Sequence, residues 1–287
     1  MAKSQFEYVK AFEVDDRLLP NCYILVRLDG RGFSKFTKQH EFAKPNDLRG
    51  VELMNHCAKC LLCDFPDVLV AIGHSDEYSF ILRKEADLWS RRASKLQSSF
   101  ASYFSSLFVF HWPMYFPDLP LLYPPMFDGR TVLYPSVQNV RDYLSWRQAD
   151  CHINNLYNTC FWSLVLQSSL SEAEAHRRLS ATNSAQKNEM LFRDYGVNYN
   201  SLPPIFRKGT VLARHAPLIT VHNPKTGEHT TRPGKKITVE WHQDIITDPQ
   251  FWLLYCPQLF LPTETNPSSS VSNPSLPSSS SSSSSLS

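Results

Sequence analysis

The chain has 287 residues, of which 42% are apolar and 20% are charged, and its formal net charge is +2. This length is enough for one large core or two smaller ones, and the composition excludes a chain that is disordered throughout. No apolar run approaches the roughly 20 residues that cross a bilayer, and residues 1–16 lack the apolar segment of a secretory signal. We therefore expect no membrane partner and a cytoplasmic protein, with the nucleus or a mitochondrion as alternative compartments.

The first elements are predicted to be a strand and a helix. Residues 23–29 are apolar and β-rich except at Arg27 and Asp29, which indicates a buried strand that ends in a carboxylate. Residues 30–34 follow as a glycine-containing turn, whose free N–H groups could bind an anion. Residues 45–65 have helical periodicity, and Asn46 is placed to cap the first turn.

A β-hairpin is predicted next. Two apolar strands, 68–72 and 78–82, flank the turn-forming residues 73–75. Asp76 and Glu77 then stand directly after the turn, open to solvent. Adjacent carboxylates on a rigid element suit a hard cation such as Mg2+, although acidic residues beside a turn more often serve only solubility.

A helix over 87–110 and a strand over 126–134, which begins with a turn at 128–129, complete the order βαββαβ. This α+β order is ferredoxin-like, with an antiparallel sheet and two helices on one face. The strand order 4-1-3-2, common in such sheets, places the first strand beside the strand that begins at Asp76. Asp29 and Asp76 would then meet at one edge of the sheet, which strengthens the interpretation of a metal site.

From residue 136 onward the pattern is mostly helical. Helices are predicted over 136–150, 151–167, 171–179 and 183–195, with Ser171 and Glu174 as a capping box, and extended segments in 203–242 have turns at 224–227 and 232–234. Amides are dense around His152 and Asn155, which favours ligand or polynucleotide contacts and buried amide networks about equally. Residues 262–287 are rich in serine and are predicted to be disordered.

The seven cysteines are expected to be free thiols, since no secretory signal is found. His56, Cys57, Cys60 and Cys63 have a spacing that could hold a metal or an iron–sulfur cluster. Residues 51–65 nevertheless have an amphipathic pattern in which cysteine is a small buried side chain, and this core interpretation is favoured.

Basic residues are concentrated in two stretches, 83–95 and 207–236, although the net charge alone indicates no nucleic-acid partner. Each stretch is either a solvated face, the commoner case, or part of a surface that follows phosphates. A strand-end aspartate, a glycine turn and an acidic hairpin are what two-metal phosphoryl transfer requires. The cations that could contact a triphosphate are Arg27, Arg31, Lys44 and Lys95.

Eight short motifs lie in order along the chain: LDGRGFSKF (28–36), AKPND (43–47), GHSDEYSF (73–80), RRASK (91–95), FDGR (127–130), YLSWRQADCHINNLYN (143–158), KNEMLF (187–192) and RKGT (207–210). Together they resemble the tRNA-histidine guanylyltransferase family, at family-like spacing from about residue 3 to residue 210. HINNLYN after SWRQAD is the most diagnostic part. The segment after residue 210 follows the family pattern poorly, and the serine tail is not part of it.

This resemblance implies an enzyme that adds a guanylate from GTP to the 5′ end of tRNA-His, in the 3′-to-5′ direction. ATP would first activate the tRNA 5′-monophosphate, the 3′-hydroxyl of GTP would then displace AMP, and pyrophosphate would finally be removed. A polymerase-palm-like catalytic domain over 1–135, two Mg2+ ions and a homotetramer are also implied. A mostly helical region with some strands over 136–261 and the tail over 262–287 would follow.

Three alternatives remain. A template-dependent 3′-5′ polymerase that repairs tRNA 5′ ends is a close relative, whereas a nucleotidyl cyclase has no need of the amide-rich helical region. A non-catalytic RNA-binding protein has no use for carboxylates that repel one another without a metal.

The resemblance also assigns roles to residues. Asp29, Asp76 and Glu77 match the catalytic acidic site, in which Asp29, Asp76 and the Gly30 carbonyl hold the metal. The nucleotide-binding segments are matched by Asp29, Gly30, Arg31, Gly32, Phe33, Ser34, Ser75 and Asp76, and Lys44 is expected to join them. The positions expected to contact tRNA or phosphate are Arg27, Lys95, His152, Asn155 and Lys187.

Overall fold

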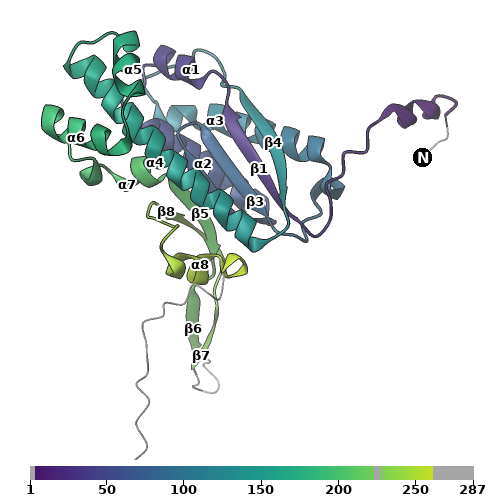
Figure 1. The fold of residues 1–287 in the computed structure, drawn as a ribbon. Coiled ribbons are helices and arrows are strands. Elements are labelled where there is room, and N and C mark those ends of the chain that lie inside the picture. The colour runs from purple at the N-terminus through teal and green to yellow at the C-terminus, as the bar shows by residue number, and fades with distance from the viewer. Residues whose placement is uncertain (1–3, 223–226, 228, 261–287) are drawn as a thin grey trace, which may run out of the picture.

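A six-stranded antiparallel sheet forms the centre of the molecule, in a computed structural model that describes residues 4–222, 227 and 229–260 (Figure 1). The strands are β1 (Tyr23–Gly30), β2 (Val68–His74), β3 (Glu77–Leu82), β4 (Phe127–Tyr134), β5 (Thr210–His215) and β8 (Ile237–Trp241). Their order across the sheet is β4-β1-β3-β2-β5-β8. The predicted order 4-1-3-2 is therefore confirmed for the first four strands, and β5 and β8 extend the sheet beyond β2.

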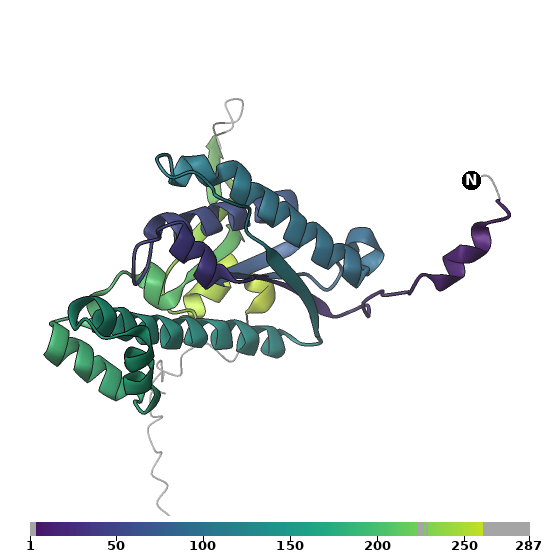
Figure 2. The same cartoon turned by 90° about the horizontal axis from the view of Figure 1, so that it is seen from above.

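The two faces of the sheet follow from the alternation of side chains along β1. Its even-numbered residues 24–28 are buried in a core with the helices α2 (Leu48–Asp64) and α3 (Ala93–Tyr115). Tyr23 and Leu25 belong to a second core, which α4 (Val137–Gln167) covers from the opposite face (Figure 2). The prediction of two helices on one face is confirmed for α2 and α3, and the odd-numbered polar residues of β1 face α4.

The hairpin turns later than predicted. β2 continues through Gly73 to His74, and the turn is made by Ser75 and Asp76, with Ser75 in the left-handed region at φ 54°. Gly73 is required for a different reason, because a Cβ there would lie 2.3 Å from the ring of Tyr78, its partner across the strands. Glu77 is consequently the first residue of β3 and is buried, where the sequence predicted a side chain open to solvent.

Three helices differ from their predicted bounds. α2 begins at Leu48 and is capped by Asp47 instead of Asn46, because the Asp47 carboxylate accepts the N–H of Arg49. The predicted helix 87–110 is a 3-10 turn, η2 (Leu88–Arg91), followed by α3. The two predicted helices over 136–167 are one continuous helix, α4, since no glycine or proline interrupts the chain between them.

The second half of α4 extends past the sheet and supports two shorter helices. These are α5 (Glu172–Ser180) and α6 (Ser184–Tyr195), which share a separate apolar cluster with α4. The predicted capping box of Ser171 and Glu174 is confirmed at the start of α5. After η3 (Tyr199–Ser201) and α7 (Pro204–Lys208), the chain enters the sheet as β5.

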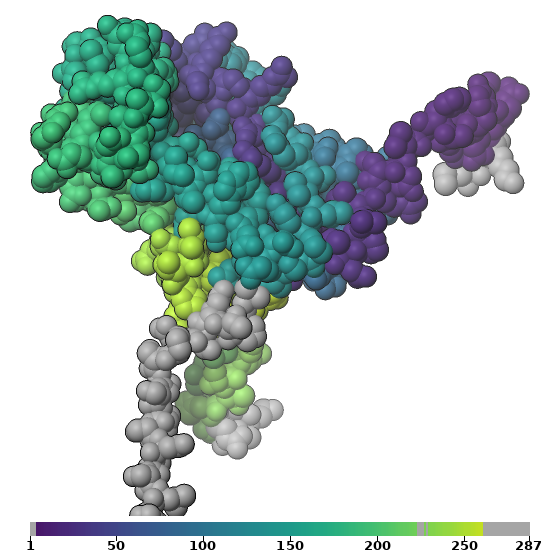
Figure 3. Space-filling view, in the orientation of Figure 1, coloured from purple at the N-terminus to yellow at the C-terminus, as the bar shows by residue number. Residues whose placement is uncertain are grey.

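The C-terminal part adds a ribbon and a helix. β6 (Leu218–His222) and β7 (His229–Pro233) form a two-stranded ribbon that projects from the body (Figure 1, Figure 3). α8 (Pro249–Tyr255) and η4 (Pro257–Leu259) join the core under α4. Residues 232–233 were predicted in a turn but end β7, whose pairing with β6 continues to Pro233. Residues 224–226 of the turn predicted at 224–227 and the serine tail over 262–287 lie outside the described residues.

All seven cysteines are free, as predicted, but only Cys57 of the three in α2 is fully buried, while Cys60 is half-buried and Cys63 is exposed. The core interpretation is therefore wrong for Cys63, which faces solvent.

Within the described ranges, no helix combines the length and the apolar character needed to cross a membrane.

Candidate active site at the end of β1

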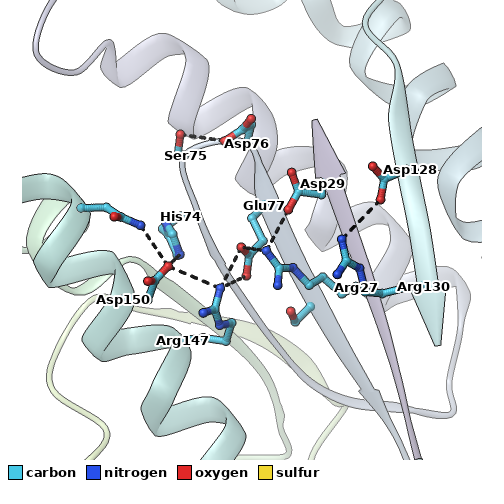
Figure 4. A network of polar contacts seen from close by, with 12 residues as sticks. Arg27, Asp29, His74, Ser75, Asp76, Glu77, Asp128, Arg130, Arg147 and Asp150 are labelled. Atoms are coloured by element: carbon cyan, nitrogen blue, oxygen red, sulfur yellow. Dashed lines mark hydrogen bonds and ion pairs between the residues drawn. The ribbon is translucent and has the colours of Figure 1, made fainter. Parts of the chain in front are cut away.

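Three acidic residues lie side by side where β1 ends (Figure 4). Asp29 pairs with Glu77 of β3 on one side and with Asp128 of β4 on the other, which places all three on the face of the sheet that α4 covers. The turn predicted at 128–129 is wrong, because the ladder between β1 and β4 continues through these residues to Phe127. The sheet thus assembles acidic groups from segments that are far apart in the sequence.

Glu77 is held between two arginines. Arg27 donates through Nη2 to Glu77 Oε2 at 2.5 Å and to Asp29 Oδ2 at 2.8 Å. Arg147 of α4 donates through Nη1 to both carboxylate oxygens of Glu77 at 3.0 Å. The side chains of Glu77 and Arg147 are only 8% and 4% exposed. Both oxygens of Glu77 and the guanidinium of Arg27 are therefore already engaged in a buried network.

Asp76 lies in the hairpin turn beside the end of β1. Its backbone carbonyl accepts the N–H of Gly30 at 3.0 Å, and Ser75 Oγ donates to its Oδ1 at 3.0 Å. Burial raises the pKa of the Asp76 carboxyl to about 6, and the neighbouring Asp29 and Glu77 carboxylates contribute to this rise. Asp29 and Asp76 are thus brought to the same end of the sheet, where an ionised Asp76 is costly in the absence of a cation.

Gly30 permits the close approach of β1 to the hairpin turn. A Cβ at this position would lie 2.7 Å from the Phe33 ring and 2.9 Å from the Cβ of Asp76. Gly32, at φ 65°, then directs the chain into α1 (Phe33–Gln39). Glycine is therefore needed at both positions, at Gly30 for the close approach and at Gly32 for the left-handed backbone.

The turn after β1 presents two polar side chains to solvent and an aromatic side chain to the core. Arg31 and Ser34 are exposed, and the Arg31 N–H donates to the Met126 carbonyl at 2.8 Å. Phe33 is 8% exposed and packs against the rings of Phe36, Phe108 and Phe127, so its side chain belongs to the core. Any contact of Phe33 with a ligand would have to come from its backbone.

Lys44 lies between α1 and the second half of α4. Its Nζ donates to Thr37 Oγ1 at 3.3 Å and stands 5.2 Å from the ring centroid of Trp162. Burial is the main cause that lowers the pKa of its ammonium group. Lys44 is therefore a half-buried cation at the side of α1.

Of two neighbouring positions expected to contact tRNA, Asn155 lies in the interior and His152 is half-buried. Asn155 is buried, where its Oδ1 accepts from Asn46 at 2.9 Å and its Nδ2 donates to the Tyr199 hydroxyl at 3.1 Å. His152 packs edge-on against Tyr199 at 5.3 Å, and burial, with Lys208 and Arg207 nearby, lowers the pKa of its imidazole. For this segment the sequence favoured ligand contacts and a buried amide network about equally. Asn155 takes part in a buried amide network.

The two lysines of the same set are far from each other. Lys187 of α6 donates to the Thr182 carbonyl at 2.6 Å and lies over the Tyr157 ring at 5.8 Å. Lys95 is exposed in the first turn of α3, next to Arg91, which binds the carbonyl of Cys22 at the start of β1. α3 packs on the face of the sheet opposite to the acidic row, so the acidic row does not include Lys95.

The sequence motifs contained three further site residues that were given no role. Arg147 of α4 pairs with Glu77, and Asp150 one turn later lies 3.4 Å from Arg147 and 3.7 Å from His74. Asp128 completes the acidic row on β4. Arg147 and Asp150 stand in the SWRQAD motif, and their spacing of three residues on a helix was the one signal that could have linked them.

The chain matches a known protein family over most of its length. Residues 6–135 match the family model described as tRNAHis guanylyltransferase, and residues 138–247 match its C-terminal domain. A Dictyostelium discoideum protein named probable tRNA(His) guanylyltransferase is 52% identical over 255 residues, which cover 89% of this chain and 97% of that protein.

Two solved structures are similar as well. The crystal structure of the Saccharomyces cerevisiae tRNA(His) guanylyltransferase matches with a TM-score of 0.70 and 43% identity, over 80% of this chain and 97% of that one. A bacterial Thg1-like protein in complex with ATP shares the fold, with a TM-score of 0.67 and 22% identity over 90% of this chain and 99% of that one. On the family matches and the sequence identity, this chain belongs to the tRNA-histidine guanylyltransferase family.

Proposed function

We propose that this protein, a nucleotidyltransferase by family, adds a guanylate from GTP to the 5′ end of tRNA-His in the 3′-to-5′ direction. ATP would activate the 5′-phosphate of the tRNA, and the 3′-hydroxyl of GTP would then displace AMP. The observation that carries this proposal is the position of Asp29 and Asp76 at one strand end, beside a glycine turn whose residues 31, 32 and 34 are exposed. A polymerase-palm-like core over 1–135 is part of the proposal, supported by the strand order β4-β1-β3-β2.

The acidic groups at the end of β1 suit an oxygen-preferring cation. Asp29 is 33% exposed on its side chain and gives only Oδ2 to Arg27 among the described contacts, which leaves Oδ1 for a ligand. The raised pKa of Asp76 means that its ionised form is disfavoured at this site, and a bound cation would stabilise that form. Asp29, Asp76 and the Gly30 carbonyl would hold two Mg2+ ions. Bound there, Mg2+ would lower the pKa of the attacking hydroxyl and neutralise charge on the leaving group.

The remaining residues would position the substrates. The first turn of α1 leaves N–H groups without an intrahelical acceptor, and with Arg31, Ser34 and Ser75 they would face the nucleotide phosphates. Lys44 would approach them from the side of α1. Glu77 would act by fixing Arg27 and Arg147 behind the acidic row, because both of its oxygens are engaged.

The proposed tRNA-binding surface lies in the helical region and is completed by other subunits. The tRNA would lie along the helical region over 136–261, where His152 and Lys187 reach the surface in part and Asn155 maintains the shape of α4. A homotetramer would build this surface from several subunits, and the cytoplasm is the proposed compartment. Lys95 has no part in the acidic row and would contact tRNA only on the face of the sheet that α3 covers.

One assay separates this function from its alternatives. The protein is incubated with Mg2+, ATP, labelled GTP and a tRNA-His transcript that carries a 5′-monophosphate. Label at the 5′ end of the tRNA is expected, and a second tRNA with the same acceptor sequence but another anticodon tests the choice of tRNA-His. Cyclic nucleotide formation would indicate a cyclase, efficient repair of several truncated tRNAs would indicate the repair polymerase, and binding without incorporation would contradict an enzymatic role.

Mg2+ is expected to stabilise the protein more at about pH 8 than at about pH 5. The pKa of Asp76 is about 6 in the folded protein against an ordinary value of 3.8, so the folded protein binds this proton more tightly than the unfolded chain does. Without metal, this carboxyl therefore lowers the stability as the pH rises through that window. A bound cation removes the penalty only where the group is ionised. Thermal unfolding with and without Mg2+ at both pH values measures the effect.

The matched control is Asp76→Asn, which cannot ionise. Its response to Mg2+ should be small, and its change between the two pH values should be weaker than that of the wild type. A wild-type response that is equal at both pH values would contradict the assignment of Asp76 as a metal ligand.

A further inference from the structure

A cluster of metal-ligating side chains lies on the other side of the sheet from Glu77 and Arg147. His56 and Cys60 are one turn apart on α2, and His111 reaches them from α3. Their ligating atoms all lie within 4.8 Å of one another, and among the described residues this is the one such group of three. The proposed transferase reaction makes no use of it.

The two imidazoles are already held together. The rings of His56 and His111 are stacked, with centroids 4.1 Å apart and an interplanar angle of 29°. His56 Nδ1 lies 2.8 Å from the hydroxyl of Tyr115, also on α3. A ligating histidine commonly has its other ring nitrogen in such a hydrogen bond, which fixes the ring and leaves Nε2 as the donor to the metal.

The cluster opens into a cavity of about 620 Å³. Its lining includes His56 and Cys60 together with acidic side chains, Glu52, Asp64 and Glu240. The nearby ammonium of Lys59 is paired with Glu240 at 3.3 Å, so its charge is partly balanced. All three ligating residues are half-buried, so an ion can enter from solvent.

We propose that His56, Cys60 and His111 form a site for a zinc-type transition-metal ion that joins α2 to α3. Two imidazoles and one thiolate are the donors that Zn2+ prefers, and the spacing of four residues on a helix places His56 and Cys60 on one side of the ion. Mg2+, which the acidic site at β1 would take, prefers oxygen ligands and does not compete here. The fourth position is filled by water or by a small ligand in the cavity. The site is independent of the proposed transferase function.

The test uses the full chain, stripped with a chelator and then given one equivalent of Co2+ as a spectroscopic substitute for Zn2+. A thiolate-to-cobalt charge-transfer band is expected together with the visible bands of a tetrahedral ion. The carboxylates at β1 cannot produce the charge-transfer band, because they offer no sulfur. After return to Zn2+ and removal of free metal, about one zinc per chain should remain bound.

Three variants decide the assignment. Cys60→Ser should abolish the charge-transfer band and the retained zinc, and His111→Asn should weaken both. Cys63→Ser, which changes an exposed thiol one turn further along α2, should leave both unchanged. Absence of the band in the wild type, or a band that persists in Cys60→Ser, overturns the proposal. Circular dichroism of the serine variant establishes that it is folded, and zinc should raise the unfolding temperature of the wild type and not of Cys60→Ser.

Discussion

Replacing Asp76 with asparagine is expected to lower guanylate addition by about 10³-fold, a loss of about 4 kcal/mol in stabilisation of the transition state. Asparagine keeps the size of the side chain and can still accept the hydrogen bond from Ser75. It removes the charge that the proposed Mg2+ site needs. Incorporation of labelled GTP into tRNA-His under single-turnover conditions measures the loss, and filter binding shows whether tRNA affinity is kept.

The same variant should be at least as stable as the wild type in metal-free buffer at about pH 8. The raised pKa of Asp76 means that its ionised form opposes folding there, so removal of the charge removes that penalty. Asp142→Asn is the matched control, since Asp142 is an exposed aspartate of α4. It should change neither activity nor stability. Asp29→Asn should reproduce the loss of activity. Wild-type turnover by both site variants would exclude the carboxylate centre.

Replacing Arg147 with methionine is expected to destabilise the fold by about 3–5 kcal/mol, because it leaves the buried Glu77 carboxylate with Arg27 as its remaining partner. Methionine fills much of the same volume, so the loss reports mainly the missing charge and hydrogen bonds. Urea unfolding measures the change. Arg130→Met is the matched control, because Arg130 and Asp128 form an exposed pair at 3.9 Å that should contribute less than about 1 kcal/mol.

The double variant Arg147→Met, Glu77→Gln separates two roles of Glu77. With both charges removed, the stability should recover in large part, so the two single changes are not additive. Additive losses would contradict the buried pair. If activity recovers together with stability, the buried pair serves only the stability of the fold. If stability recovers and incorporation does not, the pair is also needed to position the groups that react.

The strands and their order could be predicted because each strand carries its own local pattern. The apolar run of β1 ends at Asp29 and the run of β2 is followed by turn-forming residues, so the strand ends that meet at Asp29 and Asp76 were visible. The turn of the hairpin was placed too early, because Gly73 resembles a turn residue. Its actual reason is the ring of Tyr78, which no local pattern reports.

The partners of Glu77 could not be predicted, since they depend on how α4 crosses the sheet. A difference of one residue in a strand moves a side chain to the opposite face, so the placement of Glu77 inside or outside β3 decides whether it is buried. Arg147 lies 70 residues away in the sequence, and only the packing of α4 brings it to Glu77. The exposure of Lys95 and the burial of Asn155 depend in the same way on packing between distant segments.

The pairing of β5 with β2 limits how the two matched parts of the chain can separate. Four register pairs, from Val70–Ala213 to Gly73–Thr210, connect a strand of the first part with a strand of the second. A protein truncated after residue 135 would expose the edge of β2, including unpaired backbone groups beside the hairpin that carries Asp76. The catalytic strands and the helical region should therefore unfold as one cooperative unit, and the first part alone should aggregate instead of forming a small independent enzyme.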